Sequence, residues 1–204
     1  MLKKSPPKKS IFFKKAFALF SGSILAGFGL SLAINAGYGS ATLAVLWQGV
    51  SVITNLSIGT ASMVVSVIMF IFVWYYDKKQ LHIGTIVYQL VYGYSIDFFN
   101  QYRMYFNNPY LNLIVMLIGV LLLSVGTGVY ASANMGKGAY DAVCFAISNR
   151  CNIPLFKIRI LGDFVCAAGG YLLGGTIGLC TVATIVIAGK TIQKTWKIMQ
   201  TFYN

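Results

Sequence analysis

Six apolar runs, each about as long as a lipid bilayer is thick, constrain the fold of this chain more than any other feature. They occupy residues 16–34, 59–76, 83–99, 111–133, 155–173 and 177–196. A helix needs roughly 20 mostly apolar residues to cross the hydrocarbon core. Only 10% of the chain is charged, too little to cover a water-facing surface, so we expect lipid to surround most of it. The runs predict an all-α, polytopic membrane helix bundle with six spans.

The distribution of Lys and Arg predicts how these spans are oriented. If the N-terminus lies in the cytoplasm, the basic residues gather in cytoplasmic segments (1–15, 77–82, 134–157 and the C-terminal end), and the outer side carries only Arg103. An excess of basic residues on the cytoplasmic side is typical of membrane proteins. We therefore expect a multi-pass plasma-membrane protein with both termini in the cytoplasm. Residues 1–15 are expected to form a basic, disordered tail.

Two further apolar stretches, residues 40–56 and 139–151, are shorter and more broken. If either one crossed the membrane, every later segment would change sides and the charge bias would be lost. Each stretch is therefore interpreted as a short helix that stays on the side where the preceding span emerges. The sequence leaves open whether these helices are re-entrant or interfacial.

The net charge of +12 does not indicate a nucleic-acid partner, because the basic residues lie at the ends of apolar runs and form no continuous face. Their position suits contact with the lipid bilayer and its anionic headgroups. The four cysteines form no CxxC pair and accompany no histidine cluster, so we expect neither a metal site nor a cofactor. The sequence also lacks a Gly-rich phosphate loop and a paired-carboxylate motif, which argues against an enzyme.

An Asn-x-Gly-x-Gly element interrupts the apolar pattern twice, as NAGYGSA and as NMGKGAY. The matching residues are Asn35 with Asn134, Gly37 with Gly136, and Gly39 with Gly138. Glycine admits backbone conformations that other residues resist, so both elements are interpreted as breaks in the helical structure. At membrane depth, non-helical backbone persists only where protein buries it or where it lines a wet cavity.

The two breaks belong to a longer repeat. Asn55 pairs with Asn152, His82 with Gly178 and Tyr92 with Ala188, and the offset falls from 99 residues at the breaks to 97 and then 96. Residues 16–103 and 111–198 then form two membrane repeats of one integral domain. Because each repeat contains three spans, an odd number, the second enters the membrane inverted. Inverted repeats recur in secondary transporters, whose working site lies near the bilayer midplane.

These motifs resemble the YczE/YyaS/YitT family of bacterial integral membrane proteins. The likeness rests on the two Asn-x-Gly-x-Gly elements, on NLSIGTAS from Asn55, and on a second half that includes IPLFKIRILGDFV and GYLLGGTIGLCTV. It covers residues 16–196 and implies a multi-spanning plasma-membrane protein whose molecular activity is not defined. Two departures are Thr42, at the position that matches Asp141, and Cys180, where glycine is more typical.

Polar side chains follow one face of the third predicted span. Thr85, Gln89 and Tyr92 lie at spacings of four and three, and Asp97 follows near the outer end. Such a stripe must point into the bundle rather than toward lipid. It is interpreted either as a structural hydrogen-bonded network or as part of a solute path.

Charged residues of the second repeat supply the other candidates. Arg159 and Asp163 are one turn apart and can pair on one helix face. The pair is either structural, or functional with Arg159 holding an anionic group of a substrate and Asp163 holding Arg159. Asp141 follows the second break and, like Thr42 after the first, is expected to cap its short helix. The positive end of each short helix would then face inward as an anion site.

Two functions follow from these observations. The first is a small-solute transporter or permease for a small molecule or an ion. Its cavity would be lined by Thr85, Gln89, Tyr92, Asp97, Asp141, Arg159 and Asp163. The alternative is a non-transporting membrane accessory or regulatory protein with a dry interior and a protein partner. A homodimer through faces of small residues is a further option that the sequence does not settle.

Overall fold

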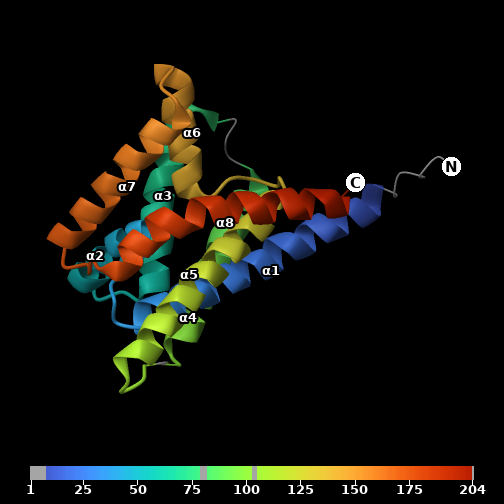
Figure 1. The fold of residues 1–204 in the computed structure, drawn as a ribbon. Coiled ribbons are helices and arrows are strands. Elements are labelled where there is room, and N and C mark those ends of the chain that lie inside the picture. Colours follow the sequence, from blue (N-terminus) through green and yellow to red (C-terminus); the bar gives the residue numbers. More distant parts are fainter. Residues whose placement is uncertain (1–7, 79–81, 103–104, 204) are drawn as a thin grey trace.

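The computed structural model describes residues 8–78, 82–102 and 105–203, which form eight α-helices and their connecting loops (Figure 1). The helices are α1 (Lys8–Asn35), α2 (Thr42–Thr54), α3 (Ile58–Tyr76), α4 (Ile83–Asn100), α5 (Pro109–Ser132), α6 (Ala139–Cys151), α7 (Leu155–Leu172) and α8 (Leu179–Tyr203). The prediction of an all-α bundle is confirmed over these residues.

The six longer helices coincide with the six predicted apolar runs to within a few residues, apart from extensions of α1 and α8, and α2 and α6 coincide with the two shorter stretches. In the part of the chain that the structure describes, three helices are long and apolar enough to cross a membrane, namely Phe12–Asn35 within α1, Ile58–Tyr76 and Pro109–Ser132. α1 begins at Lys8, inside the segment 1–15 that we expected to be disordered, because no proline follows Pro7 to interrupt it. Residues 1–7 of that segment lie outside the described residues.

α1 and α5 form the centre of the bundle and run antiparallel. Gly22 of α1 meets the backbone of α5 at Tyr130, whereas Gly29 meets it at Leu123, so residue numbers rise in opposite directions. A side chain at either glycine would collide with backbone atoms of α5. The glycines therefore let the two helix backbones approach closely, which is the role that small residues have in membrane helix pairs.

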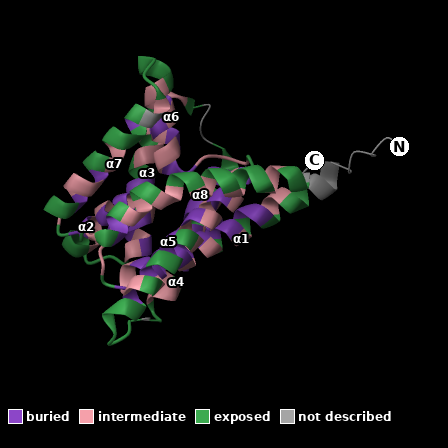
Figure 2. Cartoon of the chain, viewed as in Figure 1, coloured by how far each residue is buried: buried purple, intermediate pink, exposed green. Residues whose placement is uncertain are grey.

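α4 and α8 flank this central pair, each running parallel to its neighbour. On one side Gly27 of α1 packs against Ser95 of α4, and the Ser31 hydroxyl donates to Asn100 Oδ1 at 2.8 Å. On the other side α5 packs along α8, and Gln200 Nε2 donates to the carbonyl oxygen of Ser132 at 3.0 Å. The layer α4–α1–α5–α8 contains most of the buried residues (Figure 2).

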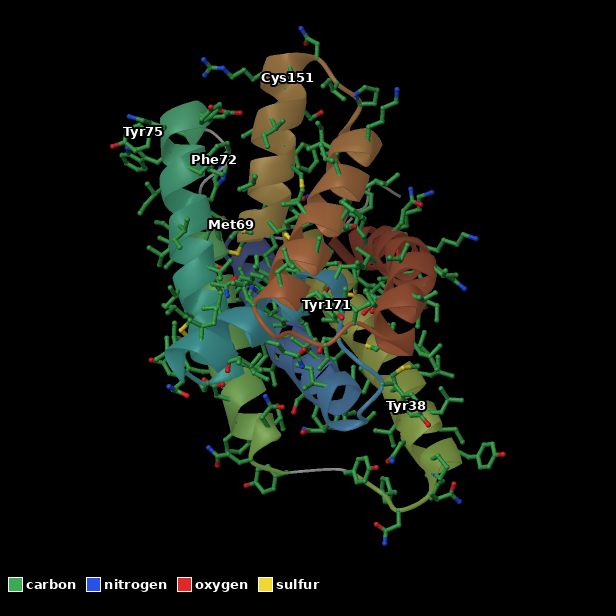
Figure 3. All side chains as sticks on the ribbon, turned by 90° about the vertical axis from the view of Figure 1, so that its left-hand side faces the viewer. Tyr38, Met69, Phe72, Tyr75, Cys151 and Tyr171 are labelled. Carbon is green, nitrogen blue, oxygen red and sulfur yellow. The ribbon has the colours of Figure 1, made fainter. Side chains whose placement is uncertain are left out.

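The remaining helices pair across the two halves of the chain. α2 packs on α7, where Gly170 of α7 touches the α2 backbone at Val45. α6 packs on α3, and the Arg150 guanidinium lies 5.0 Å from the centre of the Tyr76 ring. Figure 3 shows the ends of α3 and α6 at the same end of the molecule, opposite Tyr38. α3 and α6 therefore run in the same direction.

The predicted breaks lie between α1 and α2 and between α5 and α6. Gly37, Gly39 and Gly136 adopt positive φ of +79°, +86° and +150°, as the interpretation of the breaks requires. Gly138 differs, since its φ is −57°; Asn134 takes the left-handed conformation in that break instead, with φ +51°. Gly138 is needed for space, because an added Cβ would lie 2.9 Å from the Tyr130 hydroxyl.

Each break packs against the start of the last helix of the other half. The Tyr38 carbonyl accepts from Cys180 N at 2.9 Å, and the Ser40 carbonyl accepts from Thr181 Oγ1 at 2.6 Å, at the start of α8. The second break touches the start of α4, where Gly136 lies against Thr85. Asn35 ends α1 and donates to Asn100 Oδ1 at 3.3 Å. The breaks thus hold the two halves together.

Candidate functional site

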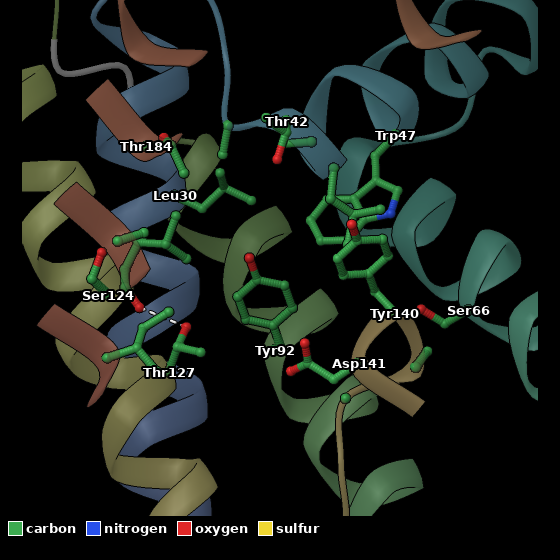
Figure 4. A pocket seen from close by; sticks show the side chains of 18 of the residues that line it. Leu30, Thr42, Trp47, Ser66, Tyr92, Ser124, Thr127, Tyr140, Asp141 and Thr184 are labelled. Carbon is green, nitrogen blue, oxygen red and sulfur yellow. Dashed lines mark hydrogen bonds between the residues drawn. The ribbon is translucent and has the colours of Figure 1, made fainter. Parts of the chain in front are cut away.

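A cavity of about 140 Å³ lies at the centre of the bundle, where α2 and α6 begin (Figure 4). Residues from all eight described helices line it. Figure 4 shows Tyr92 and Asp141 near one another on one side, with Ser124, Thr127 and Thr184 across the space. An apolar cavity of about 150 Å³ in another protein admits benzene, so this volume suits a ligand of a few non-hydrogen atoms.

The first turns of α2 and α6 face this cavity without a side-chain cap. The residues that precede the two helices are Ala41 and Gly138, and neither offers a capping side chain. Backbone N–H groups in a first turn have no partner within their helix. The capping expected of Thr42 and Asp141 is wrong, because both lie inside the helix, where their side chains reach α7 instead.

Arg159 pairs with Asp141 and not with Asp163, which corrects the expected pairing within α7. Arg159 Nη1 lies 2.8 Å from Asp141 Oδ1, and the two side chains are 47% and 26% exposed. Asp163 Oδ1 instead lies 2.8 Å from the Tyr140 hydroxyl and 3.3 Å from Thr42 Oγ1. A spacing of one turn allows a pair on α7, but packing of α6 against α7 brings Asp141 closer to the guanidinium. Asp163 therefore links α7 to the starts of α2 and α6.

An aromatic stack forms one wall of the cavity. Tyr88 stacks on Tyr130 with ring centres 3.7 Å apart and on Tyr92 at 5.3 Å, and Trp47 meets Tyr92 edge-on at 5.8 Å. All four side chains are buried, and the Trp47 indole N–H has no hydrogen-bond partner among the described residues. Only Tyr92 was predicted. The spacing of four residues between Tyr88 and Tyr92 is a signal that sequence reasoning missed, whereas Trp47 and Tyr130 have no such signal.

The predicted polar stripe of α4 is buried, but the cavity takes only part of it. Gln89 and Tyr92 line the cavity, and Gln89 Nε2 donates to Ser62 Oγ at 3.2 Å. Thr85 is buried one turn away, beside the second break. Asp97 lies outside the cavity lining, at the other end of α4. The prediction placed all four residues in one site because the stripe runs along the whole of α4. The cavity, however, contacts only the middle of that helix.

A second hollow of about 370 Å³ adjoins the central cavity and shares Tyr130 and Asp141 with it. It is also lined by His82 and Lys137, from the chain segments before α4 and α6. The Lys137 ammonium lies 3.4 Å from the centre of the Phe145 ring. Partial burial lowers the pKa of Lys137 below its usual value, and the Asp141 carboxylate acts in the opposite direction.

Within the described residues, no group of three or more His, Cys, Asp or Glu side chains could hold a metal ion. The four cysteines are free thiols, three of them buried. The central cavity offers hydrogen-bonding groups, an ion pair and aromatic rings, which are groups that can hold a small polar molecule.

Comparison with known proteins finds relatives in two bacteria, one of them described as a membrane protein. A relative from Haemophilus influenzae, an uncharacterised protein, is 31% identical over 86% of this chain and 79% of its own. The uncharacterised membrane protein YczE of Bacillus subtilis is 26% identical over 85% of this chain and 81% of its own. YyaS of the same organism is 23% identical over 84% and 87%. No solved structure matches the chain significantly.

The apolar helices and the YczE relative support a membrane location, and the resemblance to the YczE and YyaS proteins is confirmed. The model of a family of unknown function, DUF6198, matches residues 13–197. The chain therefore belongs to the DUF6198 family.

Proposed function

We propose that this protein is a plasma-membrane transporter for a small polar solute, built from two inverted repeats of three spans. The observation that carries the proposal is the start of two short helices, α2 and α6, at one central cavity. Transporters with inverted repeats place their binding site where broken helices from the two repeats meet. The cavity would then be the solute site, with each short helix re-entrant.

The packing of the two halves supports the repeat. Suppose that the four helices of the first half correspond in order to the four helices of the second half. The contact of α1 with α4 then corresponds to that of α5 with α8, and the contact of α2 with α7 corresponds to that of α6 with α3. All four pairs of helices pack together. The ends of the short helices also match, since Asn55 and Asn152 both adopt the left-handed conformation, at φ +58° and +54°. Just before them, Ser51 Oγ donates to the Leu56 carbonyl and Ser148 Oγ to the Ile153 carbonyl. Corresponding positions thus carry the same local structure.

Helix directions support an odd number of crossings in each half. α1 and α4 run parallel, and α3 runs antiparallel to α4, since Ser62 contacts Gln89 while Gly59 contacts Asp97. The start of α1 and the end of α8 lie at one end of the bundle (Figure 1). The basic residues near that end favour a cytoplasmic location for it. α2 would run from the cavity to the outer face, and α6 from the cavity to the cytoplasmic face.

α4, α7 and α8 are less apolar than a membrane span usually is, which agrees with membrane-crossing helices that line the cavity of a transporter. These helices carry Gln89, Arg159, Asp163 and Thr184, which line the cavity rather than face lipid. Polar groups inside a membrane protein are costly unless they face a partner or a water-filled space. The six-span count therefore needs a wet cavity at this place.

The charges of the cavity favour a neutral or zwitterionic solute. Each helix start contributes roughly half a positive charge, and Arg159 adds one more. The two negative charges of the Asp141 and Asp163 carboxylates balance this positive charge. The Arg159 guanidinium is already paired with Asp141. The unpaired Trp47 indole N–H could donate to a carbonyl or carboxylate oxygen of the solute, because buried donors without partners are rare. The aromatic stack suits the apolar part of the solute.

Uptake into proteoliposomes tests this proposal. The full chain is reconstituted and a panel of small, radiolabelled neutral and zwitterionic solutes is screened. Uptake by the transporter should saturate and fall about tenfold or more in Asp163→Asn, because hydrogen bonds to a charged group are the strongest in the site. Arg150→Gln is the matched control, since Arg150 ends α6 far from the cavity and contacts Tyr76. The absence of uptake for every solute, together with a cavity closed to water, would contradict the proposal.

A further inference from the structure

The two halves differ in how their last two helices meet. α3 packs along α4, whereas α7 and α8 make at most slight contact. Gly93 of α4 shows the difference, because a Cβ there would meet Met63 and the Gly59 carbonyl of α3. Its counterpart in the repeat is Gly189 of α8, at the offset of 96 residues, and no atom lies within 4 Å of a Cβ at that position. The first half is therefore closed between α3 and α4, whereas the second half is open between α7 and α8.

A carboxylate holds the closed half together. Asp97 of α4 accepts from the Gly59 backbone N–H at 2.7 Å, from Ser57 Oγ at 2.5 Å and from Thr60 Oγ1 at 3.3 Å. Ser57 is the residue that caps α3, and it accepts from Thr60 N at 3.2 Å. A carboxylate at a helix N-terminus gains from free N–H groups and from the helix dipole. Asp97 thus fixes the start of α3 to the end of α4.

Among the described residues of the open half, no hydrogen bond corresponds to those of Asp97. The counterpart of Asp97 is Gln193, which is exposed and carries no charge. α7 follows Pro154, which has no side chain that could cap it. Because α7 and α8 are joined at the outer end and stand apart at the other, the cavity faces the side of the second hollow. This is the cytoplasmic side in the proposed topology.

We propose that Asp97 is the latch that closes the central cavity on its outer side, and that the structure is the inward-facing state. This inference rests on the proposed function. In transporters with inverted repeats, alternating access is largely rocking or gating of one repeat against the other around a fixed site. When Asp97 is released from α3, α3 can separate from α4 in the way that α7 already stands apart from α8. This separation opens the cavity to the outer side. Asp97 is a positioning residue, since it does not touch the solute site.

Thiol labelling tests the latch without any solute. The four native cysteines are replaced by alanine or serine, and Ser66→Cys places one thiol in the cavity wall. The variant is reconstituted in vesicles, and a membrane-impermeant thiol reagent is applied to one face at a time. The latch predicts labelling from the cytoplasmic face. Asp97→Ala should raise the labelling rate from the outer face about tenfold, as expected for loss of a charged cap.

Two further variants separate latching from general damage. Ser57→Ala removes one donor to Asp97 and should raise outer labelling in the same direction, but less. Gln193→Ala changes the matching residue of the open half and should leave outer labelling unchanged. Folding of each variant is checked by size-exclusion chromatography.

Labelling of the parent from the cytoplasmic face, with no increase in outer labelling in either Asp97→Ala or Ser57→Ala, would overturn the latch and leave the proposed function standing. Labelling of the parent from neither face would overturn the proposed function itself, and the latch with it. An outer rate that rises equally in Gln193→Ala would also overturn the latch, because the effect would not be specific to the closed half.

Discussion

The Arg159 guanidinium of α7 and the Asp141 carboxylate of α6 form an ion pair of 2.8 Å at the wall of the central cavity. Both residues belong to the second half of the chain. Their counterparts in the first half are Ser62 and Thr42, which carry no charge. The cavity is thus lined by residues from both halves of the chain, and the second half supplies its charges. We expect solute recognition in the proposed transporter to depend on this asymmetry.

Removing one partner of the ion pair should destabilise the protein more than removing both. Asp141→Asn leaves Arg159 uncompensated in a low-dielectric surrounding, and we expect a loss of about 1–3 kcal/mol, at the lower end because the guanidinium is half exposed. The double variant Asp141→Asn with Arg159→Gln should recover part of the loss. Thermal unfolding in detergent measures both effects. Strictly additive losses would show that the pair does not couple.

Glycines between α1 and α5 should tolerate no side chain. Gly126→Ala would bring a methyl group against the Ala26 backbone, so we expect a loss of about 2 kcal/mol or more, or failure to fold. Gly169→Ala is the matched control, because no atom lies within 4 Å of its Cβ position. In that helix the alanine should be neutral or stabilise by about 0.5–1 kcal/mol. Unfolding midpoints in detergent decide between these outcomes, and equal effects of the two changes would contradict the packing.

The two glycines of the first break should differ in their sensitivity. Gly37→Ala faces only its positive φ, since the nearest atom, from the Tyr105 ring, is 3.5 Å away, and a cost of about 1–2 kcal/mol follows. Gly39→Ala adds a collision with the Gly178 backbone to a similar φ, so it should cost more. Limited proteolysis and thermal unfolding compare the two variants. A larger effect at Gly37 would disagree with the close contact between the break and α8.

Trp47→Phe should separate ligand binding from stability. The indole N–H has no protein partner among the described residues, so its removal breaks no hydrogen bond in the folded state. Stability should change by less than about 1 kcal/mol, while affinity for the transported solute falls about fivefold. Uptake and thermal shift with the solute identified in the screen provide the two readouts. Unchanged affinity would exclude Trp47 as a donor to the solute.

Topology reporters test the orientation proposed for the bundle. A reporter that is active only in the cytoplasm should work when fused after Asp77 or after Gln200, and fail when fused after Asn107. A reporter that is active only outside should give the reverse pattern. This outcome agrees with three crossings in each half and with the short helices being re-entrant. Cytoplasmic activity after Asn107 would contradict the six-span topology.

Much of the helical structure was predictable because bilayer-length apolar runs have few alternatives to a helix. The bounds of α3 and α4, for example, differ from the predicted runs by one residue at most. The breaks were also predictable, since Gly37, Gly39 and Gly136 need conformations that other residues avoid. These features depend on neighbouring residues in the chain and on the solvent around it.

The site was predicted only in part. Gln89, Tyr92, Asp141, Arg159 and Asp163 do line one cavity, but no sequence pattern excluded Thr85 or Asp97 from it. Asp97 lies on the same predicted stripe of polar residues, but it is near the end of α4, away from the residues of α4 that line the cavity. The partner of Arg159 was also missed, because a spacing of one turn identifies which residues can meet on one helix and says nothing of a second helix.

The sequence by itself determined that the chain forms apolar helices suited to a membrane and where those helices break, and it predicted that two related halves follow one another. Only the tertiary structure decided which groups meet, because Asp141, Tyr140 and Thr42 reach Arg159 or Asp163 through the packing of α6 and α2 against α7. The tertiary structure also decided that α3 packs against Gly93, while no atom lies within 4 Å of a Cβ position at Gly189. Two similar sequences can adopt different packings of their helices, and that difference is a property of the assembled bundle.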